Sequence, residues 1–223
     1  FFNWCLDNEK ATNRPFKNYE STPDLYGTPI YITIDERNQI LNTDLSHRPQ
    51  LAIQRDIFIF QCLIGCRVGD LYKMTSSSVI NNAIEYIPRK TKEERPVTTR
   101  VPLNDTAKGL LQQYKGKDKE GRIFPFISEQ KYNEAIKEVF RLSDITHSVT
   151  VINPTTREEE KRPINEIASS HLARRTFVGN LYKKVKDPNL VGALSGHKEG
   201  SRAFARYRDI DEEMKAELIK MLD

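Results

Sequence analysis

The sequence lacks the short patterns that mark the commonest cofactor and nucleophile sites. It contains neither G-x-x-x-x-G-K-[ST] nor G-x-G-x-x-G, so no loop for nucleotide phosphates is indicated. It also contains no C-x-x-C, H-E-x-x-H or G-x-S-x-G, so the sequence does not support a zinc site or a serine-hydrolase nucleophile. We therefore expect no cofactor and no metal ion.

Cysteine is scarce and long apolar runs are absent. Three cysteines cannot build a disulfide framework, and their odd number fits a reducing compartment. Cys62 and Cys66 lie four residues apart in an apolar segment without further ligands at zinc-like spacing, so we expect core thiols. No 18-residue apolar run and no basic-then-apolar leader occurs. These features predict a soluble, intracellular, globular protein.

The net charge of +4 is small because regions of opposite sign offset each other. Residues 1–60 carry six Lys or Arg against eight Asp or Glu, and residues 209–223 carry two against six. The basic excess lies between them, with ten against five in residues 86–125 and nine against two in residues 171–208. If the fold joins these basic blocks, they form a face that attracts a polyanion; ordinary variation on a solvated surface is the alternative.

Local signals predict a mainly α protein with a small antiparallel β-sheet, an α+β fold. Helices are expected where apolar residues recur at helical spacing or cap residues stand at the ends: from Thr33, then 49–64, 104–114, 128–142, 170–184, 187–196, 201–206 and 212–222. Short strands are expected at 79–80, 83–87 and 97–101, and a second hairpin at 148–164.

The first 26 residues differ from the rest of the chain. Phe1 to Leu6 is typical of the last turns of an apolar helix, and the run from Asn13 to Asp24 is rich in Pro, Asn and Ser, as linkers are. We expect residues 1–26 to be the end of an upstream domain plus a linker, and residues 27–223 to form one domain. A natural N-terminal extension is the alternative.

Several basic residues stand where the chain is expected to turn. Arg67 follows the apolar segment, and an arginine so close to buried residues needs an anionic partner. Asp70 either supplies that partner as a local ion pair, which is the simpler interpretation of this segment alone, or orients Arg67 toward an external anion. Lys90, at the tip of the first hairpin, can reach a ligand or simply aid solubility.

Two later segments add groups suited to a phosphate. His171 and Arg174 are three residues apart near the start of a predicted helix, so they share one face close to its N-terminus. His197 directly follows a predicted helix end. Tyr207 lies among arginines, which favour the phenolate form, although a surface tyrosine covering arginine stems has the same pattern. The neighbouring arginines are Arg202, Arg206 and Arg208.

Taken in order, these residues resemble the active-site signature of the tyrosine recombinases, the phage-integrase family. The turn around Arg67 is similar to the family's G-x-R-x-x-[ED]-L box, and the segment Ser170–Phe177 to its H-x-x-R helix. The segment Leu194–Tyr207 resembles its closing segment, most of all in integrases of conjugative transposons or other integrative elements. The resemblance covers roughly residues 30–223. The positions that correspond to its catalytic set are Arg67, Lys90, His171, Arg174, His197 and Tyr207.

The resemblance implies a tyrosine recombinase catalytic-domain fold over residues 27–223, with residues 1–26 as the end of a core-binding domain plus its linker. It implies a site-specific recombinase or integrase that cleaves and rejoins DNA for integration or excision of a mobile element. In such an enzyme Tyr207 would form a covalent 3′-phosphotyrosine link, without metal or ATP. Arg67 and Arg174 would clamp the phosphate oxygens.

The remaining positions receive supporting roles from the same resemblance. His197 would add a hydrogen bond to the phosphate, and His171 would assist proton transfer at the nucleophile. Lys90, or alternatively Lys92, would protonate the leaving 5′-oxygen. Asp70 would fix the neighbouring groups. Side chains expected to contact DNA nearby are Lys92, Arg175, Arg202 and Arg206.

The family also implies partners and a location. The expected partner is double-stranded DNA at specific recombination sites, bound by a homotetramer, with accessory DNA-bending or directionality proteins and no membrane. The expected location is the bacterial cytoplasm, at the nucleoid. An apolar stripe near the C-terminus suits packing either on a neighbouring protomer or on its own domain; it comprises Met214, Leu218, Ile219 and Leu222.

Three other functions compete with this interpretation. A type IB topoisomerase would use similar chemistry to relax DNA without exchanging strands. A non-catalytic DNA-binding regulator should lack one of the catalytic groups, and none is missing here. A metal-dependent nuclease would use His171, His197 and Asp70, and its activity would disappear in EDTA.

Overall fold

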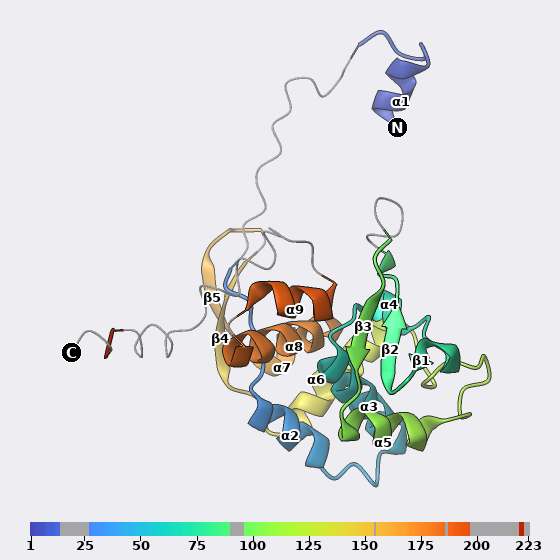
Figure 1. The fold of residues 1–223 in the computed structure, drawn as a ribbon. Coiled ribbons are helices and arrows are strands. Elements are labelled where there is room, and N and C mark those ends of the chain that lie inside the picture. Colours follow the sequence, from blue (N-terminus) through green and yellow to red (C-terminus); the bar gives the residue numbers. More distant parts are fainter. Residues whose placement is uncertain (14–26, 90–95, 154, 186, 197–218, 221–223) are drawn as a thin grey trace.

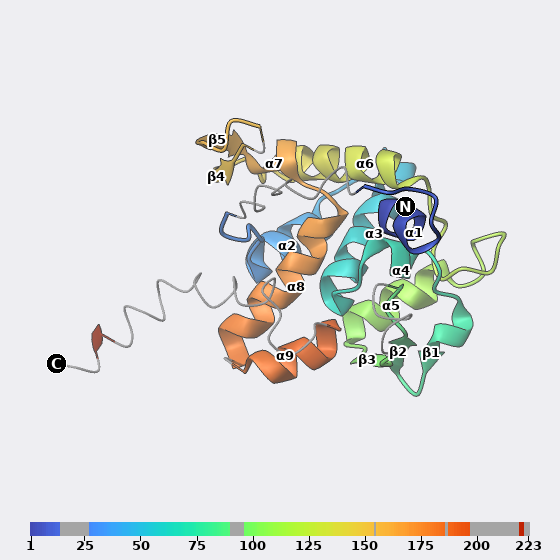
Figure 2. The ribbon, with the colours of Figure 1, turned by 90° about the horizontal axis from the view of Figure 1, so that it is seen from above.

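The computed structural model describes residues 1–13, 27–89, 96–153, 155–185, 187–196 and 219–220, and shows helices with two small sheets (Figure 1). The long helix α3 (Pro49–Ile64) lies at the centre of the helical body. It packs most extensively on α8 (Ser170–Val185) and also contacts α6 (Glu129–Leu142), α2 (Ile34–Asn42) and α5 (Asp105–Tyr114) (Figure 2). The mainly α fold expected from the sequence is confirmed.

The core between these helices is aromatic and aliphatic. Phe58, Phe60, Phe124, Tyr132 and Phe140 are its largest fully buried side chains. Phe58 meets Phe140 edge to face at 5.4 Å between ring centroids, a preferred aromatic geometry. Cys62 and Cys66 are buried in the same core as free thiols, as predicted.

Cap residues set the helix ends where the sequence predicts them. Thr33 Oγ1 accepts a hydrogen bond from the Glu36 backbone N–H, and Glu36 Oε2 accepts one from the Thr33 N–H, so the capping box opens α2. Asp187 caps α9 (Pro188–Ser195), which has proline at its first position. Gly65 and Gly196 end α3 and α9 in the left-handed conformation, with φ of 67° and 65°.

The two sheets lie on opposite sides of the helical body (Figures 1 and 2). The three-stranded sheet has the antiparallel order β1 (Val79–Ile80), β2 (Ala83–Tyr86), β3 (Thr99–Pro102). Asn81 and Asn82 make its first turn at φ of 47° and 58°, values that asparagine tolerates well. The second sheet is the hairpin of β4 (Ser148–Ile152) and β5 (Glu159–Pro163).

Short elements complete the described structure. The N-terminal helix α1 (Phe2–Asp7) confirms the helix expected there and buries no side chain. Three one-turn helices in the described residues were not predicted from the sequence: α4 (Val68–Leu71), η1 (Ser76–Ser78) and α7 (Ile164–Ile167). The helices expected at 201–206 and 212–222 lie outside the described residues, apart from Ile219 and Lys220. In the described part of the chain, every helix falls short of the length and apolarity that crossing a membrane requires.

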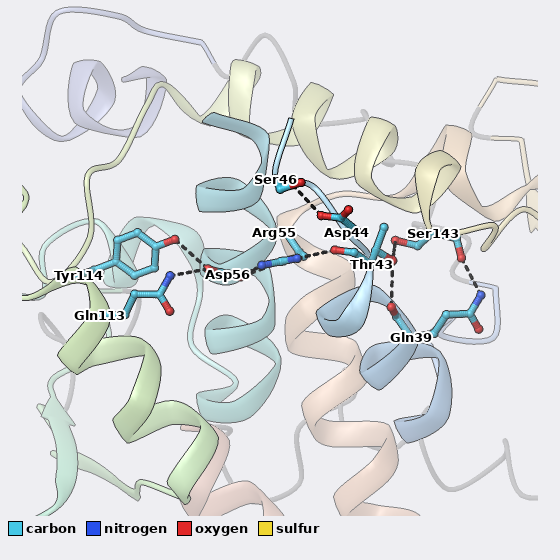
Figure 3. Close-up of polar contacts among 9 residues, drawn as sticks. All are labelled: Gln39, Thr43, Asp44, Ser46, Arg55, Asp56, Gln113, Tyr114 and Ser143. Atoms are coloured by element: carbon cyan, nitrogen blue, oxygen red, sulfur yellow. Dashed lines mark hydrogen bonds and ion pairs between the residues drawn. The ribbon is translucent and has the colours of Figure 1, made fainter. Parts of the chain in front are cut away.

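A polar cluster joins the helices on the side of α3 that faces α2 and α5 (Figure 3). Asp56 of α3 is buried, and its Oδ2 accepts hydrogen bonds from Tyr114 Oη at 2.7 Å and Gln113 Nε2 at 3.3 Å. Its Oδ1 accepts from Arg55 Nε at 2.9 Å, and Arg55 Nη1 donates to the Thr43 carbonyl oxygen at 2.6 Å. The cluster therefore ties α5 and the end of α2 to α3.

Candidate active site

The turn that presents Arg67 is held by tight packing and one buried amide. Gly65, at positive φ, lies under Phe177 of α8 so closely that a Cβ would stand 2.2 Å from the ring. No side chain fits there. Directly after it, the Cys66 carbonyl oxygen accepts a hydrogen bond from Gln61 Nε2 at 3.1 Å. Arg67 follows, half-buried, as the N-terminal cap residue of α4.

Helix α8 brings an imidazole and a buried guanidinium to the same place. Arg174 is only 3% exposed, and its Nη1 donates to the carbonyl oxygens of Gly65 at 2.6 Å and Ser195 at 2.7 Å. These carbonyls lie at the C-terminal ends of α3 and α9, where helices leave acceptors unpaired and the dipole favours a cation. His171 lies one turn earlier and is exposed. Arg174 thus joins three helices beside the Arg67 turn.

Asp70 connects the first hairpin to this place. Its Oδ1 accepts a hydrogen bond at 2.9 Å from the backbone N–H of Arg89, the residue before Lys90. Its Oδ2 is buried without a hydrogen-bond partner among the described residues. No ion pair joins Arg67 to Asp70 within these residues, so of the two alternatives for this segment the local pair does not form. The partner of Asp70 is instead a backbone group 19 residues away.

The end of α9 lies against the sheet at the same site. A Cβ on Gly196 would stand 3.0 Å from Thr99 Oγ1 of β3 and 3.1 Å from Pro88 Cγ. Gly196 is the residue before His197, and Pro88 lies two residues before Lys90. The described neighbours of these two predicted residues are therefore in contact.

These segments surround one pocket of about 540 Å³. It is lined by Gln61, Arg67, Val68, Gly69, Asp70, Arg89, Glu129, Ser170, His171 and Arg174. Three guanidinium groups and an imidazole face two carboxylates, so the lining carries an excess of positive charge. Guanidinium groups that converge on one pocket are suited to a phosphate, which they bind in bidentate fashion.

The phenols and thiols packed beside the pocket are not activated. Burial raises the pKa of the Cys66 thiol, and the nearby Asp70 carboxylate adds to the rise. Burial likewise raises the pKa of Tyr86, and burial with the Glu129 carboxylate raises that of Tyr72 to about 12. None of these three side chains is an anion at neutral pH, so none provides a ready nucleophile.

The described residues offer no ready metal site. Across the described ranges, no three His, Cys, Asp or Glu side chains gather closely enough to hold a metal ion. The nuclease alternative needs His197, which lies outside these ranges.

The profile of the phage integrase family matches residues 31–214, which include the whole pocket and the predicted signature positions. This chain belongs to the phage integrase family. No curated protein matches its sequence. The match agrees with the resemblance carried by the Arg67, His171 and Tyr207 segments.

Solved structures of integrases and recombinases share the fold. A phage lambda integrase dimer bound to a COC′ core site is 18% identical, with a TM-score of 0.62 over 93% of this chain and 69% of that one. The site-specific recombinase XerH in a post-cleavage complex with difH is 15% identical, with a TM-score of 0.60 over 88% and 54%. A lambda integrase tetramer on a Holliday junction is 17% identical, with a TM-score of 0.59 over 93% and 56%. This integrase-family chain thus spans about half to two thirds of these proteins.

Some of the predicted site residues come together in the structure and others are not described. Arg67, Asp70, His171 and Arg174 line one pocket, whereas Arg175 is half-buried on α8 and does not line it. Six predicted residues lie outside the described part of the chain: Lys90, Lys92, His197, Arg202, Arg206 and Tyr207.

Six pocket residues were not among the predicted site residues: Gln61, Val68, Gly69, Arg89, Glu129 and Ser170. Gln61 left one signal, because it is the polar residue within the apolar run from Ile57 to Ile64. A buried polar side chain of this kind needs a specific partner, and the Cys66 carbonyl provides it.

Proposed function

We propose that this chain is the catalytic part of a site-specific DNA recombinase or integrase, with residues 27–223 as its catalytic domain. Its reaction is cleavage and rejoining of DNA through a covalent 3′-phosphotyrosine, for integration or excision of a mobile element. The observation that carries the proposal is the convergence of Arg67, His171 and Arg174 on one pocket in a phage integrase family member.

The two arginines bind the scissile phosphate. Arg174 is fixed by two carbonyl oxygens, so its guanidinium group is oriented before DNA arrives, and Arg67 stands at a turn that lines the same pocket. Such preorganised donors stabilise charge that develops on the non-bridging oxygens in the transition state. In this environment the arginines supply the positive charge that a metal ion supplies in many nucleases.

The covalent step is carried out by residues that the family's active-site signature identifies. Tyr207 attacks phosphorus, and the bond to the 5′-oxygen breaks, so the phosphate stays on the protein and no ATP is consumed. Lys90, or Lys92 beside it, donates the proton that the 5′-oxygen takes up. His171 assists proton transfer from Tyr207, and His197 adds a hydrogen bond to the phosphate. Asp70 supports this arrangement by holding the Arg89 backbone beside the pocket.

The assembly follows from the same proposal. The tetramer on a Holliday junction and the complexes with core-site and difH DNA, reported for lambda integrase and XerH, support a homotetramer on double-stranded recombination sites. Accessory DNA-bending or directionality proteins join it in the bacterial cytoplasm, at the nucleoid. Side chains that contact the DNA backbone include Lys92, Arg175, Arg202 and Arg206. Affinity for DNA therefore falls steeply as salt rises.

A nicked suicide substrate in EDTA tests the proposal. Wild-type protein should accumulate a covalent protein–DNA adduct, and Tyr207→Phe should give none. Lys90→Ala and Lys92→Ala are compared on two substrates, one with the normal 5′-oxygen and one with a 5′-sulfur, which leaves without a proton. Cleavage of the sulfur substrate should be restored only in the variant that lacks the general acid, and this identifies the residue. No adduct on any cognate site would exclude the recombinase, and DNA cleavage that leaves no adduct and disappears in EDTA would favour the metal-dependent nuclease.

A further inference from the structure

Tyr132 and Asn133, consecutive residues of α6, each hydrogen-bond to a residue that lines the pocket, one on the side of the Arg67 turn and the other on the side of α8. Tyr132 Oη donates a hydrogen bond to Gln61 Oε1 at 3.1 Å, and Gln61 Nε2 donates to the Cys66 carbonyl oxygen at 3.1 Å. That carbonyl belongs to the peptide bond that leads into Arg67. The phenol of Tyr132 is thus connected to the Arg67 turn through one buried amide.

Asn133 fixes the other half of the pocket. Its Oδ1 accepts a hydrogen bond at 2.8 Å from the backbone N–H of Ser170, the first residue of α8. The first N–H groups of a helix have no partner inside the helix, so a side-chain acceptor determines where the helix begins. His171 is the next residue and Arg174 follows one turn later. The amide of Asn133 therefore sets the start of the helix that carries both.

The first of these connections lies in the core and the second at its edge. Tyr132 and Gln61 are fully buried, and burial keeps the pKa of Tyr132 well above its ordinary value, so the phenol remains a hydrogen-bond donor. Asn133 is half-buried. Neither Tyr132 nor Asn133 lines the pocket, so each acts on it through another residue.

We propose that Tyr132, acting through Gln61, and Asn133 are positioning residues that hold the Arg67 turn and the start of α8 at one fixed separation. The inference rests on the proposed function and deepens it. Because both residues belong to one helix, a single rigid element braces both sides of the pocket, in addition to the direct contacts that Arg174 and Phe177 of α8 make with Gly65. Phosphoryl chemistry is sensitive to such distances, since displacements well below 1 Å already change rates.

Four single substitutions separate positioning from stability. Tyr132→Phe keeps the ring and removes the donor to Gln61. Asn133→Ala removes the acceptor for Ser170, whereas Asn133→Asp keeps an acceptor and adds negative charge at a helix N-terminus, where it is favourable. Tyr114→Phe is the matched control, because it also removes one phenol hydrogen bond, to Asp56, and neither of these residues lines the pocket.

The measurement is single-turnover adduct formation by the full chain at saturating nicked DNA, with thermal unfolding of each variant. Tyr132→Phe and Asn133→Ala should slow cleavage about tenfold or more, with half-saturating DNA unchanged within about twofold. Asn133→Asp should recover most of the rate. Tyr114→Phe should lose thermal stability but cleave at the wild-type rate. Wild-type cleavage by the first two variants, or equal slowing by Tyr114→Phe, overturns the positioning role.

A second measurement does not depend on cleavage. If wild-type protein forms no adduct, the proposed function fails on its own, and binding of inorganic tungstate, a tetrahedral oxyanion, still decides the positioning role. Nuclear magnetic resonance of the Arg67 and Arg174 side chains should report about tenfold weaker binding in Tyr132→Phe and Asn133→Ala than in wild type and Tyr114→Phe. Equal affinities, or no binding by wild type, overturn the inference.

Discussion

Two buried aspartates of this chain contrast in how their carboxylates are used. Asp56, 2% exposed, has hydrogen bonds on both oxygens, from Arg55, Gln113 and Tyr114 (Figure 3). Asp70, 7% exposed, has one oxygen on the Arg89 N–H and one without a hydrogen-bond partner in the described ranges. An unsatisfied buried oxygen costs free energy of folding, so the fold tolerates at Asp70 a cost that it avoids at Asp56.

The contrast extends to the surroundings of each aspartate. Around Asp56 the polar groups are hydrogen-bonded to one another and connect neighbouring helices, which is the pattern of a structural cluster. Around Asp70 the lining leaves an exposed His171 and a half-buried Arg67 facing a pocket of about 540 Å³. The unsatisfied oxygen of Asp70 therefore lies beside a pocket that a ligand can enter, whereas the carboxylate of Asp56 is enclosed by its partners.

The largest expected effect falls on Arg174, which belongs to both the fold and the pocket. Arg174→Lys cannot reproduce the two hydrogen bonds to Gly65 and Ser195 or a bidentate contact with phosphate. We expect adduct formation to fall at least about a hundredfold. We also expect the free energy of unfolding in urea to fall by about 2–4 kcal/mol. Wild-type cleavage by this variant would remove Arg174 from the reaction.

Asp56→Asn tests the structural side of the comparison. The substitution keeps the volume but leaves the mostly buried Arg55 guanidinium without its charged partner. Urea unfolding should show a loss of about 2–3 kcal/mol. The folded fraction should cleave nicked DNA within about twofold of wild type, because the cluster does not line the pocket. A large loss of cleavage in fully folded Asp56→Asn would make the cluster part of the active site.

Asp70→Asn tests the functional side. Asparagine keeps an oxygen that accepts from the Arg89 N–H, so unfolding in urea should change by less than about 1 kcal/mol. Removal of the charge that faces the pocket should lower the cleavage rate about tenfold, measured at saturating DNA. If Asp70→Asn instead loses as much stability as Asp56→Asn and still cleaves at the wild-type rate, Asp70 has a structural role and not a functional one.

The smallest effect concerns a surface ion pair remote from both aspartates. Hydrogen bonds from Arg141 and Arg48 lower the pKa of Glu138 to about 2 from an ordinary 4.5. The stabilising contribution is therefore present above pH 4.5 and is lost as the pH falls toward 2. These side chains are partly exposed, so Glu138→Gln should cost less than about 1 kcal/mol at pH 7. Urea unfolding at pH 7, 4 and 3 should show that the difference in free energy of unfolding between wild type and Glu138→Gln becomes smaller as the pH falls.

The helix ends were predictable because their signals are local. The Thr33–Glu36 capping box, the Asp187-Pro188 start and the glycines at 65 and 196 act through neighbours in the sequence. The one-turn helix α4 was not, because four residues carry too little periodicity to register.

The candidate site likewise has a part that the sequence could predict and a part that it could not. The ordered signature predicted Arg67, His171 and Arg174, and the fold brings these three residues to one pocket. The local Arg67–Asp70 ion pair, one of two alternatives for this segment, does not form, because the partner of Asp70 is a backbone N–H that only the tertiary structure brings near. Backbone partners carry no residue signature, so the sequence could not identify this one.

The most direct test of the central claim is to map the covalent link itself. Wild-type protein is trapped on a nicked substrate in EDTA, digested, and the DNA-linked peptide is identified by mass spectrometry. We predict that Tyr207 carries the 3′-phosphate and that Arg67→Ala and Arg174→Lys, while remaining folded, form the link at least about a hundredfold more slowly. A link on any other residue, or an adduct that persists in Tyr207→Phe, would contradict it.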